Sequence, residues 1–576
     1  MISFLKIIPL IIKFFIEELK ILRVRVIYFI VFLQEVYFIK FLIQKITFNQ
    51  NLNIFKINDM NNFISYNDKT INRNFTKNSL NKKIFVESFI NHPVYTIQNC
   101  IIAYTASRIL KTECCGIIRR GDVKSKRIFD SFGIKEVIYI NQGNIFSRIY
   151  NLVIAFRLLN KIRSIDALLK LKIEKIEFGK AIYEQYLRFK KNPQIKNIVF
   201  DFYFFLAQAL VLNNQFKKIF INNNKTYLIQ AETQFFPFSL CKQNALKYNN
   251  KIISKGGELS NISLKIFKNL KNSRESRNRP SKKLFELVYR KLKKKKLKKL
   301  LNNSPRFFNL NVGKEIHQLI KKKEKLILFK SKKDVNKHFG WDNNKPIVLI
   351  LAHEFTEGNL SHSWNLFHNN FYWLEETIKK IKKIKSVNWI IKPHPSEHIY
   401  KSKVITLDIY NKLVNDELNI KLFPRSHDIL GFYKFISAVI TSSGTAGHEY
   451  PMKSVPTIIC GESNYSGFGF TLEPKSKKEY FKMLNKINKI KKLDKESVKK
   501  CFAYNYLTKY LALERIPIIH NTDITMQFEK RLFWKKTYNL LKKNGVFYQS
   551  LYNSLKFQIE KDNSYLINLN RLNNKY

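Results

Sequence analysis

The sequence predicts an α/β protein with two domains, each built around a parallel β-sheet. Short apolar runs rich in Val and Ile alternate with stretches of helical periodicity, which is typical of parallel strands buried on both faces. Clear examples are residues 389–391, 438–440 and 456–460, and each run ends in a polar or glycine-rich turn. A chain of 576 residues is too long for one hydrophobic core, so two domains are expected.

The charge favours anionic partners. The chain has 103 Lys and Arg against 43 Asp and Glu, a formal net charge of +60. Phosphorylated substrates and the cytoplasmic lipid surface would both suit this excess. Compositional drift is the alternative explanation, because the charge is spread along the chain. A nucleic-acid partner is not expected, since no recognition motif accompanies the charge. The six cysteines have no metal or disulfide spacing, which indicates the reducing cytoplasm.

The first 82 residues precede the regular pattern. Residues 1–48 are rich in Ile, Phe and Leu, but charged residues interrupt them. We therefore expect a hydrophobic, amphipathic helical extension, and neither a spanning helix nor a cleavable signal. Residues 49–82 are rich in Asn and Lys and are predicted to be a linker.

A first Rossmann-like domain is predicted over residues 83–269, and a basic segment over residues 270–340. The expected strands are residues 115–118, 136–140, 217–221 and 251–253, and the expected helices are residues 94–110, 125–133, 145–171, 199–213 and 227–248. Residues 290–301 form an intensely basic amphipathic helix in this prediction. Its alternatives are a solvated interdomain helix, a contact with anionic lipid, and a contact with nucleic acid.

A second Rossmann-like domain is predicted over residues 341–490, followed by a helical tail over residues 491–576. The expected strands are residues 347–352, 389–392, 420–423, 438–440 and 457–460, with helices at 371–384 and 428–435. Ligands of such sheets bind outside the carboxyl ends of the strands. His, Ser, Thr, Glu and Gly residues gather at that edge, which is therefore the predicted ligand site.

Lys392 and His394 close a strand in a Lys-Pro-His-Pro turn. The two prolines hold the turn extended and fix the direction of the imidazole. A His beside a Lys at a strand end suits a phosphate, because the His donates a hydrogen bond and can share positive charge. A purely structural His in a stiff turn is the alternative.

Ser442, Ser443, Gly444 and Thr445 leave the next strand and enter a predicted helix. Hydroxyls, a small residue and the N–H groups of a helix start form an anion site, so these residues are predicted to bind the donor phosphates. The motif is not a Walker loop, because no Gly-Lys-Ser/Thr occurs. Glu449 lies about one turn into the helix and is a candidate acceptor for ribose hydroxyls, with a surface carboxylate as the alternative.

His353, Glu354 and Glu357 follow the first strand of the second domain and are general-base candidates, with an exposed polar loop as the alternative. The loop at 461–471 suits a wall that stacks on a base or faces the acceptor, with a loop packed on the core as the alternative. The predicted substrate-wall residues are Arg425, Asp428, Tyr465, Ser466, Phe468 and Thr471. No metal-binding pattern and no G-x-S-x-G elbow occurs, so neither a metal nor hydrolase chemistry is expected.

Together these motifs resemble the bacterial surface and capsule polysaccharide biosynthesis proteins, which are glycosyltransferases of the GT-B fold. The Lys-Pro-His-Pro turn is similar to the family's His-Pro motif, and residues 442–450 with 455–456 are similar to its nucleotide-binding strand and helix. Residues 465–471 resemble the loop that follows, and residues 178–188 resemble a recurrent segment of the first domain.

The resemblance implies a two-domain fold facing a cleft and donors of the cytidine type, since relatives include transferases of Kdo, sialic acid and glycerol phosphate. It implies His394, Ser442 and Ser443 at the donor phosphates and Glu449 near the ribose. Near residues 222–227, where a His or Asp would be expected at the cleft, the chain has Asn and Lys.

We therefore expect a metal-independent GT-B glycosyltransferase without a cofactor. It would transfer a sugar from a nucleotide-sugar, CMP or CDP type rather than UDP, to a growing surface or capsular polysaccharide or to a lipid-linked acceptor. We expect it in the cytoplasm, peripheral at the inner face of the cytoplasmic membrane, with the anionic membrane surface as a candidate partner. The alternatives are a nucleotide-sugar epimerase of the same fold and a non-enzymatic, basic membrane-associated protein.

Overall fold

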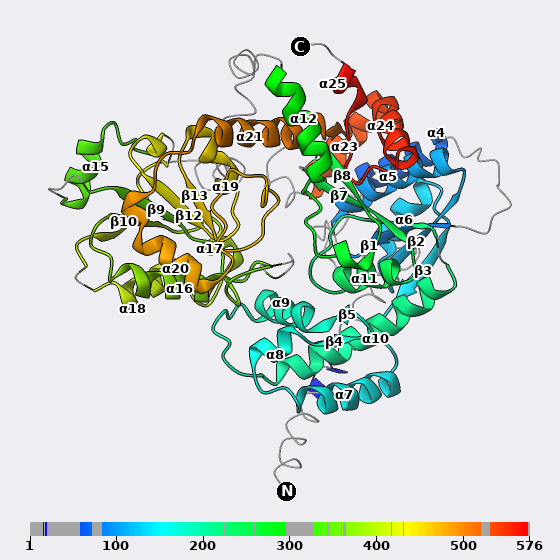
Figure 1. The fold of residues 1–576 in the computed structure, drawn as a ribbon. Helices are drawn as coiled ribbons and strands as arrows, with labels where there is room; N and C mark the ends of the chain where they lie inside the picture. The colour runs from blue at the N-terminus through cyan, green and yellow to red at the C-terminus, as the bar shows by residue number, and fades with distance from the viewer. Residues whose placement is uncertain are drawn as a thin grey trace, which may run out of the picture.

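Two β-sheets, one in each domain, organise the molecule (Figure 1). The computed structural model describes residues 15–16, 18–19, 58–71, 83–90, 92–223, 225–257, 260–294, 326–341, 345–358, 360, 364–415, 417–429, 431–519 and 530–573. Most of the predicted extension at 1–48 and residues 295–301 of the predicted basic helix lie outside these residues.

The first sheet has seven strands in the order β14-β8-β7-β6-β1-β2-β3. Its strands are β1 (Lys83–Ser88), β2 (Glu113–Arg119), β3 (Glu136–Ile140), β6 (Tyr227–Gln230), β7 (Lys251–Gly257), β8 (Asn261–Phe267) and β14 (Glu514–Arg515). The five strands from β7 to β3 are parallel, while β8 pairs antiparallel with both β7 and β14. The parallel part is therefore Rossmann-like, as the sequence predicts.

Helices cover both faces of the first sheet, and α7, α8, α9 and α10 form the lower part of the domain in Figure 1. The helices are α4 (Asn58–Thr70), α5 (Pro93–Leu110), α6 (Val123–Ser131), α7 (Ile145–Leu159), α8 (Ile165–Leu169), α9 (Phe178–Lys190), α10 (Asp201–Ile221) and α11 (Phe238–Lys247), with a small hairpin of β4 (Lys172–Ile173) and β5 (Ile176–Glu177). Apolar side chains fill two cores: one lies between the sheet and α7, α9, α10 and α11, the other between the sheet and α4, α5 and α6.

Several expectations for the N-terminal half are wrong. The predicted linker contains helix α4, whose Met60 and Phe63 are buried, and the helix expected at 145–171 is divided into α7 and α8. Residues 217–221 form the last turns of α10, because the apolar residues there continue the buried face of that helix. The segment 227–248 is no single helix, since β6 occupies its first residues and α11 begins only at Phe238. The strand β6 pairs with both β1 and β7, so tertiary pairing decides its conformation.

The second sheet is entirely parallel, with the order β11-β10-β9-β12-β13. Its strands are β9 (Ile347–Leu351), β10 (Asn388–Lys392), β11 (Ile420–Leu422), β12 (Ala438–Thr441) and β13 (Thr457–Ile459), each within two residues of its predicted bounds. The α/β class with two Rossmann-like sheets is thus confirmed. The helices are α15 (Lys332–Phe339), α16 (Asn370–Ile381), α17 (Glu397–Tyr400), α18 (Thr406–Leu413), α19 (Ala446–Glu449) and α20 (Lys477–Asn485). Of the helix expected at 428–435, only the short turn η4 (Phe432–Lys434) forms.

The C-terminal tail returns from the second domain to the first. Helix α21 (Lys495–Tyr506) and the π-helical turn η7 (Leu507–Leu511) lead to β14, which joins the first sheet. Helices α23 (Lys530–Asn544), α24 (Gln549–Glu560) and α25 (Leu569–Asn573) follow, and α23 and α24 pack beside α4 and α5 (Figure 1). The tail is helical, as predicted, but it also completes the edge of the first sheet.

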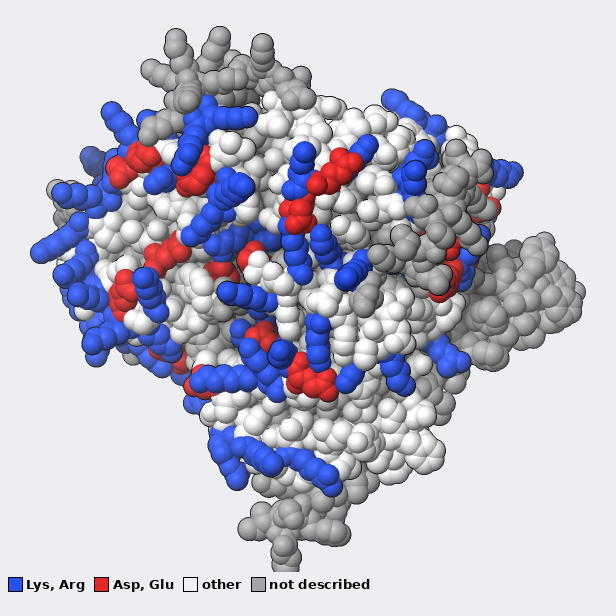
Figure 2. Space-filling model, turned by 45° about the vertical axis from the view of Figure 1, so that its right-hand side comes forward, with Lys and Arg blue, Asp and Glu red and all other residues white. Residues whose placement is uncertain are grey.

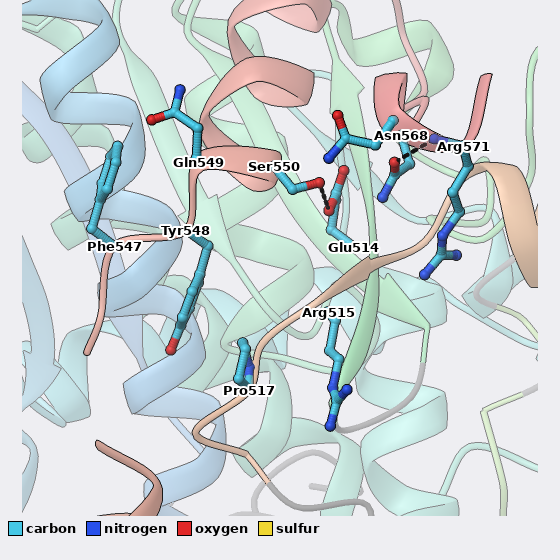
Figure 3. A pocket seen from close by; sticks show the side chains of 10 residues that line it. Glu514, Arg515, Pro517, Phe547, Tyr548, Gln549, Ser550, Asn568 and Arg571 are labelled. Carbon is cyan, nitrogen blue, oxygen red and sulfur yellow. Dashed lines mark hydrogen bonds between the residues drawn. The ribbon is translucent and has the colours of Figure 1, made fainter. Parts of the chain in front are cut away.

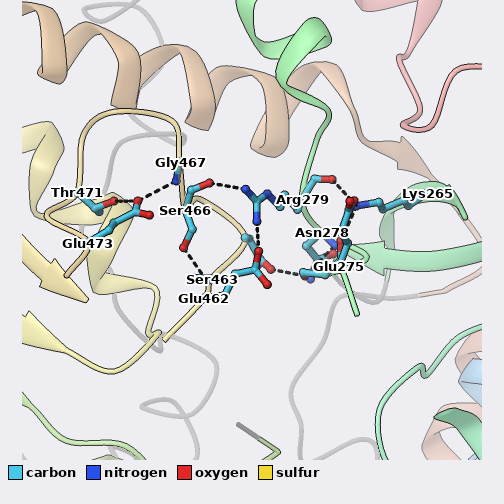
Figure 4. A network of polar contacts seen from close by, with 12 residues as sticks. Lys265, Glu275, Asn278, Arg279, Glu462, Ser463, Ser466, Gly467, Thr471 and Glu473 are labelled. Atoms are coloured by element: carbon cyan, nitrogen blue, oxygen red, sulfur yellow. Dashed lines mark hydrogen bonds and ion pairs between the residues drawn. The ribbon is translucent and has the colours of Figure 1, made fainter. Parts of the chain in front are cut away.

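A connector of residues 268–294, which includes η1 (Leu270–Asn272) and α12 (Lys282–Lys294), ties the two domains together. Buried Lys265 donates to the Glu275 carboxylate at 2.8 Å and to the carbonyl of Arg279 at 3.1 Å. Arg279 in turn pairs with the Glu462 carboxylate and donates to the carbonyl of Ser466 at 2.8 Å (Figure 4). The connector thereby joins β8 of the first sheet to the loop after β13 of the second.

Candidate functional site

The strand order of the second sheet predicts where a ligand would bind. From β9, the chain builds β10 and β11 on one side and then β12 and β13 on the other. The strand order therefore reverses between β9 and β12, and ligands of open parallel sheets bind at this switch point, outside the carboxyl ends of the strands. The residues after β9, β10 and β12 are the ones that the sequence singles out.

His353 follows β9 and contacts the end of β12. Its Nε2 lies 3.1 Å from the Thr441 hydroxyl, and the Ser443 N–H donates to the same nitrogen at 3.5 Å. An accepting Nε2 assigns the ring proton to Nδ1. Desolvation lowers the pKa of His353 to about 4, so the imidazole is neutral at pH 7.

His394 lies against His353, with nearly parallel rings whose centroids are 5.9 Å apart. The backbone N–H of Ser396 donates to its Nδ1 at 3.3 Å, which assigns the proton to Nε2 and leaves that nitrogen as a donor. Burial lowers the pKa of His394 to about 3, and His353 and Lys392 lower it further. The expected shared positive charge is therefore absent in the unliganded protein, and the role left to this ring is that of a neutral hydrogen-bond donor.

Ser442, Ser443 and Gly444 lie beside the two histidines. Ser442 is buried, and among the described residues its hydroxyl has no hydrogen-bond partner. A Cβ on Gly444 would lie 2.9 Å from Nε2 of His353, so this close approach requires glycine. An unsatisfied buried hydroxyl costs free energy, so it is a candidate contact for a ligand.

The helix after this loop is shorter than expected. Helix α19 has four residues, Thr445 at its start is exposed, and such a short helix adds little dipole to an anion site. Glu449 is its last residue and is half-buried. Burial raises the pKa of Glu449 to about 7, and its Oε2 has no hydrogen-bond partner in the described part of the chain.

The two carboxylates after β9 differ in accessibility. Glu354 is buried, and both of its oxygens accept from the Thr356 hydroxyl at 2.8 and 2.9 Å. The Glu354 carboxylate therefore stabilises the turn at residues 354–356 and is not accessible to an acceptor, contrary to the predicted catalytic role. The Glu357 side chain is exposed at the surface, but desolvation within the surrounding protein raises its pKa, with Glu354 adding to the rise and Arg188 of the first domain opposing it. Of the two, Glu357 is the one that an acceptor can reach.

The predicted wall at 465–468 is wrong. Tyr465, Ser466 and Phe468 are each at most 4% exposed and pack among α12, α21 and the loop itself, which is the core alternative. The Tyr465 hydroxyl donates to the Gly444 carbonyl, and Gly447 leaves room for its ring. Tyr465 therefore supports the Ser442–Gly444 turn from the protein interior. Thr471 donates to Glu473 at 2.6 Å, beside the network of Figure 4.

The other predicted residues lie farther along the sheet edge. Lys392 ends β10, next to His394. Arg425, which is exposed, and Asp428, which is half-buried, follow β11, and this edge strand is separated from β9 by β10. The strand order thus places them outside the switch point.

The first domain contributes groups that the sequence analysis did not single out. Arg188 lies at the end of α9, with its guanidinium 4.9 Å from the ring centroid of Tyr400 in the second domain. In the same interface Asn369 donates to the Tyr183 hydroxyl at 3.0 Å. The resemblance at 178–188 marked this helix without giving it a role. Arg277 of the connector forms an ion pair with Glu232 of the first domain at 3.1 Å, and neither residue has a sequence signal.

A separate pocket of about 470 Å³ lies in the C-terminal tail (Figure 3). It is lined by Glu514, Arg515, Pro517, Phe547, Tyr548, Gln549, Ser550, Asn568, Asn570 and Arg571. Glu514 accepts from Ser550 and Ser554 at 2.9 and 2.6 Å, so its carboxylate is already satisfied. No predicted site residue lines this pocket.

In the part of the chain that the structure describes, no three His, Cys, Asp or Glu side chains are grouped to hold a metal ion. Across the same residues, no helix combines the length and the apolar character that crossing a membrane requires. Lys and Arg cover the face in Figure 2 broadly, with Asp and Glu among them.

The fold and the switch-point geometry define an α/β protein of GT-B-like architecture. No family model matches the chain, and no curated protein matches it. Among solved structures, the beta Kdo 2,7 transferase KpsC of Thermosulfurimonas dismutans is similar at 12% identity and a TM-score of 0.29, over 55% of this chain and 89% of that one.

Two further structures are similar. A putative UDP-N-acetylglucosamine 2-epimerase from Listeria monocytogenes has 14% identity and a TM-score of 0.22, over 74% of this chain and 94% of that one. The UDP-GlcNAc 2-epimerase from Neisseria meningitidis bound to UDP-GlcNAc has 12% identity and a TM-score of 0.20, over 74% and 99%. The substrates in these descriptions belong to those proteins.

Proposed function

We propose that this protein is a GT-B glycosyltransferase that moves a sugar from a nucleotide-sugar to a surface polysaccharide or a lipid-linked acceptor. One observation carries the proposal: His353, His394 and the Ser442–Gly444 turn, which come from three strands, converge at the switch point of the second sheet. The preference for CMP or CDP donors rests on the sequence resemblance.

On the donor side, neutral groups would hold the leaving phosphate. Among the described residues, no hydrogen bond uses the Nε2–H of His394 or the hydroxyl of Ser442, so both can donate to a ligand. As the bond between the anomeric carbon and the phosphate oxygen breaks, negative charge grows on that oxygen. Donors already in place stabilise this charge without reorganisation.

On the acceptor side, Glu357 would take the proton of the attacking hydroxyl. It is exposed, and the charges of Arg188 and Glu232 act on it from the first domain. The hydroxyl oxygen forms the new bond to the anomeric carbon, its proton moves to the Glu357 carboxylate, and the nucleotide leaves with the bonding electrons. Glu354 keeps the loop in shape through Thr356.

Purified full-length protein with a panel of CMP-, CDP- and UDP-sugars and a polysaccharide acceptor tests the proposal. Transfer that requires both substrates is the expected result. If a UDP-sugar is converted without an acceptor, the protein is an epimerase. If no donor is consumed and no nucleotide raises the melting temperature, the enzymatic proposal fails.

We also propose a peripheral contact with an anionic membrane through α7. Ile145, Phe146, Ile149, Tyr150 and Val153 share one face of this helix and are 43% to 79% exposed. The next turns carry exposed Arg157, Lys161 and Arg163. An apolar face beside cations suits the boundary between headgroups and acyl chains.

Sedimentation with vesicles of phosphatidylglycerol and phosphatidylcholine tests the membrane contact. Phe146→Ser is expected to weaken binding several-fold, because Phe146 is the most exposed member of the apolar face. Phe189→Ser is the matched control, since Phe189 is similarly exposed but lies on α9. Equal binding of both variants and the unchanged protein would contradict the contact.

A further inference from the structure

The first sheet has a switch point of its own. From β1 the chain continues to β2 and β3 on one side, while β6 and β7 lie on the other. The carboxyl ends of β1 and β6 therefore border a crevice of the kind that binds ligands. Helix α5, with 18 residues, begins directly after β1, so the positive end of its dipole lies at this crevice.

Lys255, near the end of β7, is the unusual residue of this crevice. It is 5% exposed, and among the described residues it has neither a hydrogen bond nor an ion pair. Its Nζ lies 5.4 Å from the ring centroid of Tyr95, in the first turn of α5. In the β7–β8 pairing it stands opposite Leu264, next to the Ser254–Lys265 pair, so it points away from Lys265, whose Nζ is bound by the connector.

Arg277 brings a second cation to the same crevice from the connector. Its guanidinium donates to the Ala231 carbonyl, at the end of β6, and pairs with Glu232 at 3.1 Å. Electrostatic interactions link both residues of this pair to Lys255. Burial, with Arg277 next, lowers the pKa of Lys255 to about 7, while Glu232 acts in the opposite direction.

Packing alone does not account for this arrangement. A buried amine whose near neighbour is an aromatic ring, with no hydrogen-bond acceptor, destabilises a fold, and an apolar side chain of the same length would fill the space at less cost. The loop beneath is already held by Glu87, which accepts from the N–H groups of Phe89 and Ala231 at 2.9 and 3.0 Å. Lys255 is therefore not needed to close the crevice.

We propose that Lys255 and Arg277, beside the start of α5, form a subsite for an oxyanion, a carboxylate or a phosphate. The assignment of this anion to the acceptor rests on the proposed function, because the donor site lies in the second domain. The acceptor class is then an acidic sugar chain or a phosphorylated one.

The proposal has a signature that a structural lysine would lack. Near neutral pH Lys255 is only partly protonated, so an anion that pairs with it favours its protonated form. The groups that face Lys255 are Arg277, Glu232 and the Tyr95 ring, and Glu87, whose pKa burial also raises to about 7, interacts with Glu232. Binding of the anion should therefore draw protons from the buffer. It should also tighten as the pH falls from 8 to 6.5.

Calorimetric titration of the full-length protein at pH 7.5, in buffers of different ionisation enthalpy, tests this. The probes are glucuronate for the carboxylate arm and inorganic phosphate for the other. The unchanged protein is expected to bind at least one of them with proton uptake. Lys255→Met should lose about tenfold or more in affinity, since a charge-assisted hydrogen bond contributes about 1.5–3 kcal/mol.

Lys251→Met is the matched control, because Lys251 lies on the same strand in an exposed pair with Asp562, and it should bind as the unchanged protein does. Lys255→Arg keeps a fixed charge and should bind without proton uptake, which also covers the case that Lys255→Met does not fold. His394→Ala should bind glucuronate or phosphate, whichever binding depends on Lys255, with unchanged affinity. A CMP-induced rise in melting temperature should survive in Lys255→Met.

Three results would overturn the subsite: neither probe binds the unchanged protein, binding occurs without proton uptake, or Lys255→Met binds as tightly as the control. Failure of the proposed function looks different. In that case no nucleotide raises the melting temperature, while glucuronate or phosphate still binds in a manner that depends on Lys255.

Discussion

The two switch points of the molecule are built from different chemistry. The crevice of the second sheet contains neutral polar groups, namely His353 and His394, whose pKa values are lowered to about 4 and 3, and the Ser442 hydroxyl. The crevice of the first sheet contains ionisable groups: the Arg277–Glu232 ion pair and Lys255, whose pKa is lowered to about 7. The same strand topology therefore forms one site lined by neutral polar side chains, in the second sheet, and one lined by ionisable side chains, in the first sheet.

The difference teaches how the two sites divide a transfer reaction. A leaving phosphate gains charge during the reaction, so fixed neutral donors stabilise it more in the transition state than in the ground state. An acceptor keeps its charge throughout, so a cation that pairs with it contributes uniform binding. Changes in the second crevice are then expected to affect kcat, and changes in the first to affect KM.

The largest expected effect comes from the link that holds the two crevices together. Arg279→Ala leaves the Glu462 carboxylate, whose side chain is 7% exposed, without its cation. Removing one partner of a buried pair costs about 3 kcal/mol or more of unfolding free energy. Chemical denaturation measures this loss. Lys385→Ala, which breaks an exposed pair with Glu417, should cost about 0–1 kcal/mol of unfolding free energy. Equal costs for the two variants would show that the Arg279–Glu462 pair contributes no more to stability than a surface pair.

His394→Ala is the sharpest test of the second crevice. Loss of one donor to the leaving phosphate is expected to lower kcat roughly 100-fold, with little change in melting temperature. Steady-state kinetics with the preferred donor measures it. His338→Ala is the control, because His338 is exposed on α15. A change in KM alone would show that His394 binds the ground state and the transition state equally, which would contradict the expected difference between the two crevices.

Ser442→Ala should have a smaller effect. The buried hydroxyl has no partner in the described structure, so its removal should leave the unfolding free energy unchanged or slightly higher. Nucleotide affinity should fall by about 1 kcal/mol, or roughly fivefold, if the hydroxyl contacts the donor. Titration calorimetry with the nucleotide measures this, and the variant Ser426→Ala, at an exposed residue after β11, is the control. A marked loss of stability would instead show a structural role.

The smallest expected effect is the pH dependence from Glu449, whose burial is only partial. Its pKa of about 7 in the folded protein exceeds the ordinary value of 4.5. The folded state therefore holds its proton to higher pH than the unfolded state, so stability falls as the pH rises from 4.5 to about 7. Glu449→Gln should lessen this fall in thermal unfolding across that range. Parallel curves for both proteins would contradict the assignment.

Much of the second domain could be predicted from the sequence. Its strands are runs of Val and Ile buried on both faces, and such runs are recognisable without a partner strand. The residues directly after the strands inherit their positions from the topology, so His353, His394 and Ser442 were found together. Side-chain direction within loops was not predictable, because glycine at 461–471 indicates a turn and says nothing of burial. Tyr465 and Glu354 were misplaced for that reason.

Less of the first domain could be predicted from the sequence. Strand β6 has four residues, and its conformation is decided by pairing with β1 and β7 rather than by periodicity. The crevice around it depends on Lys255 and Arg277, which are two of 103 Lys and Arg residues. Among the described residues, Lys255 is marked by its burial without a hydrogen bond, which Lys242 shares, and by its place at the carboxyl end of β7, and these are properties of the folded chain.

The most direct test of the contrast between the crevices is a crystal structure of the protein soaked with CMP and, separately, with UDP. We expect the nucleotide phosphates within hydrogen-bond distance of His394 Nε2 and the Ser442 hydroxyl, with Lys255 left for a second, anionic ligand. Nucleotide phosphates bound at Lys255 and Arg277, with the second crevice empty, would contradict the account.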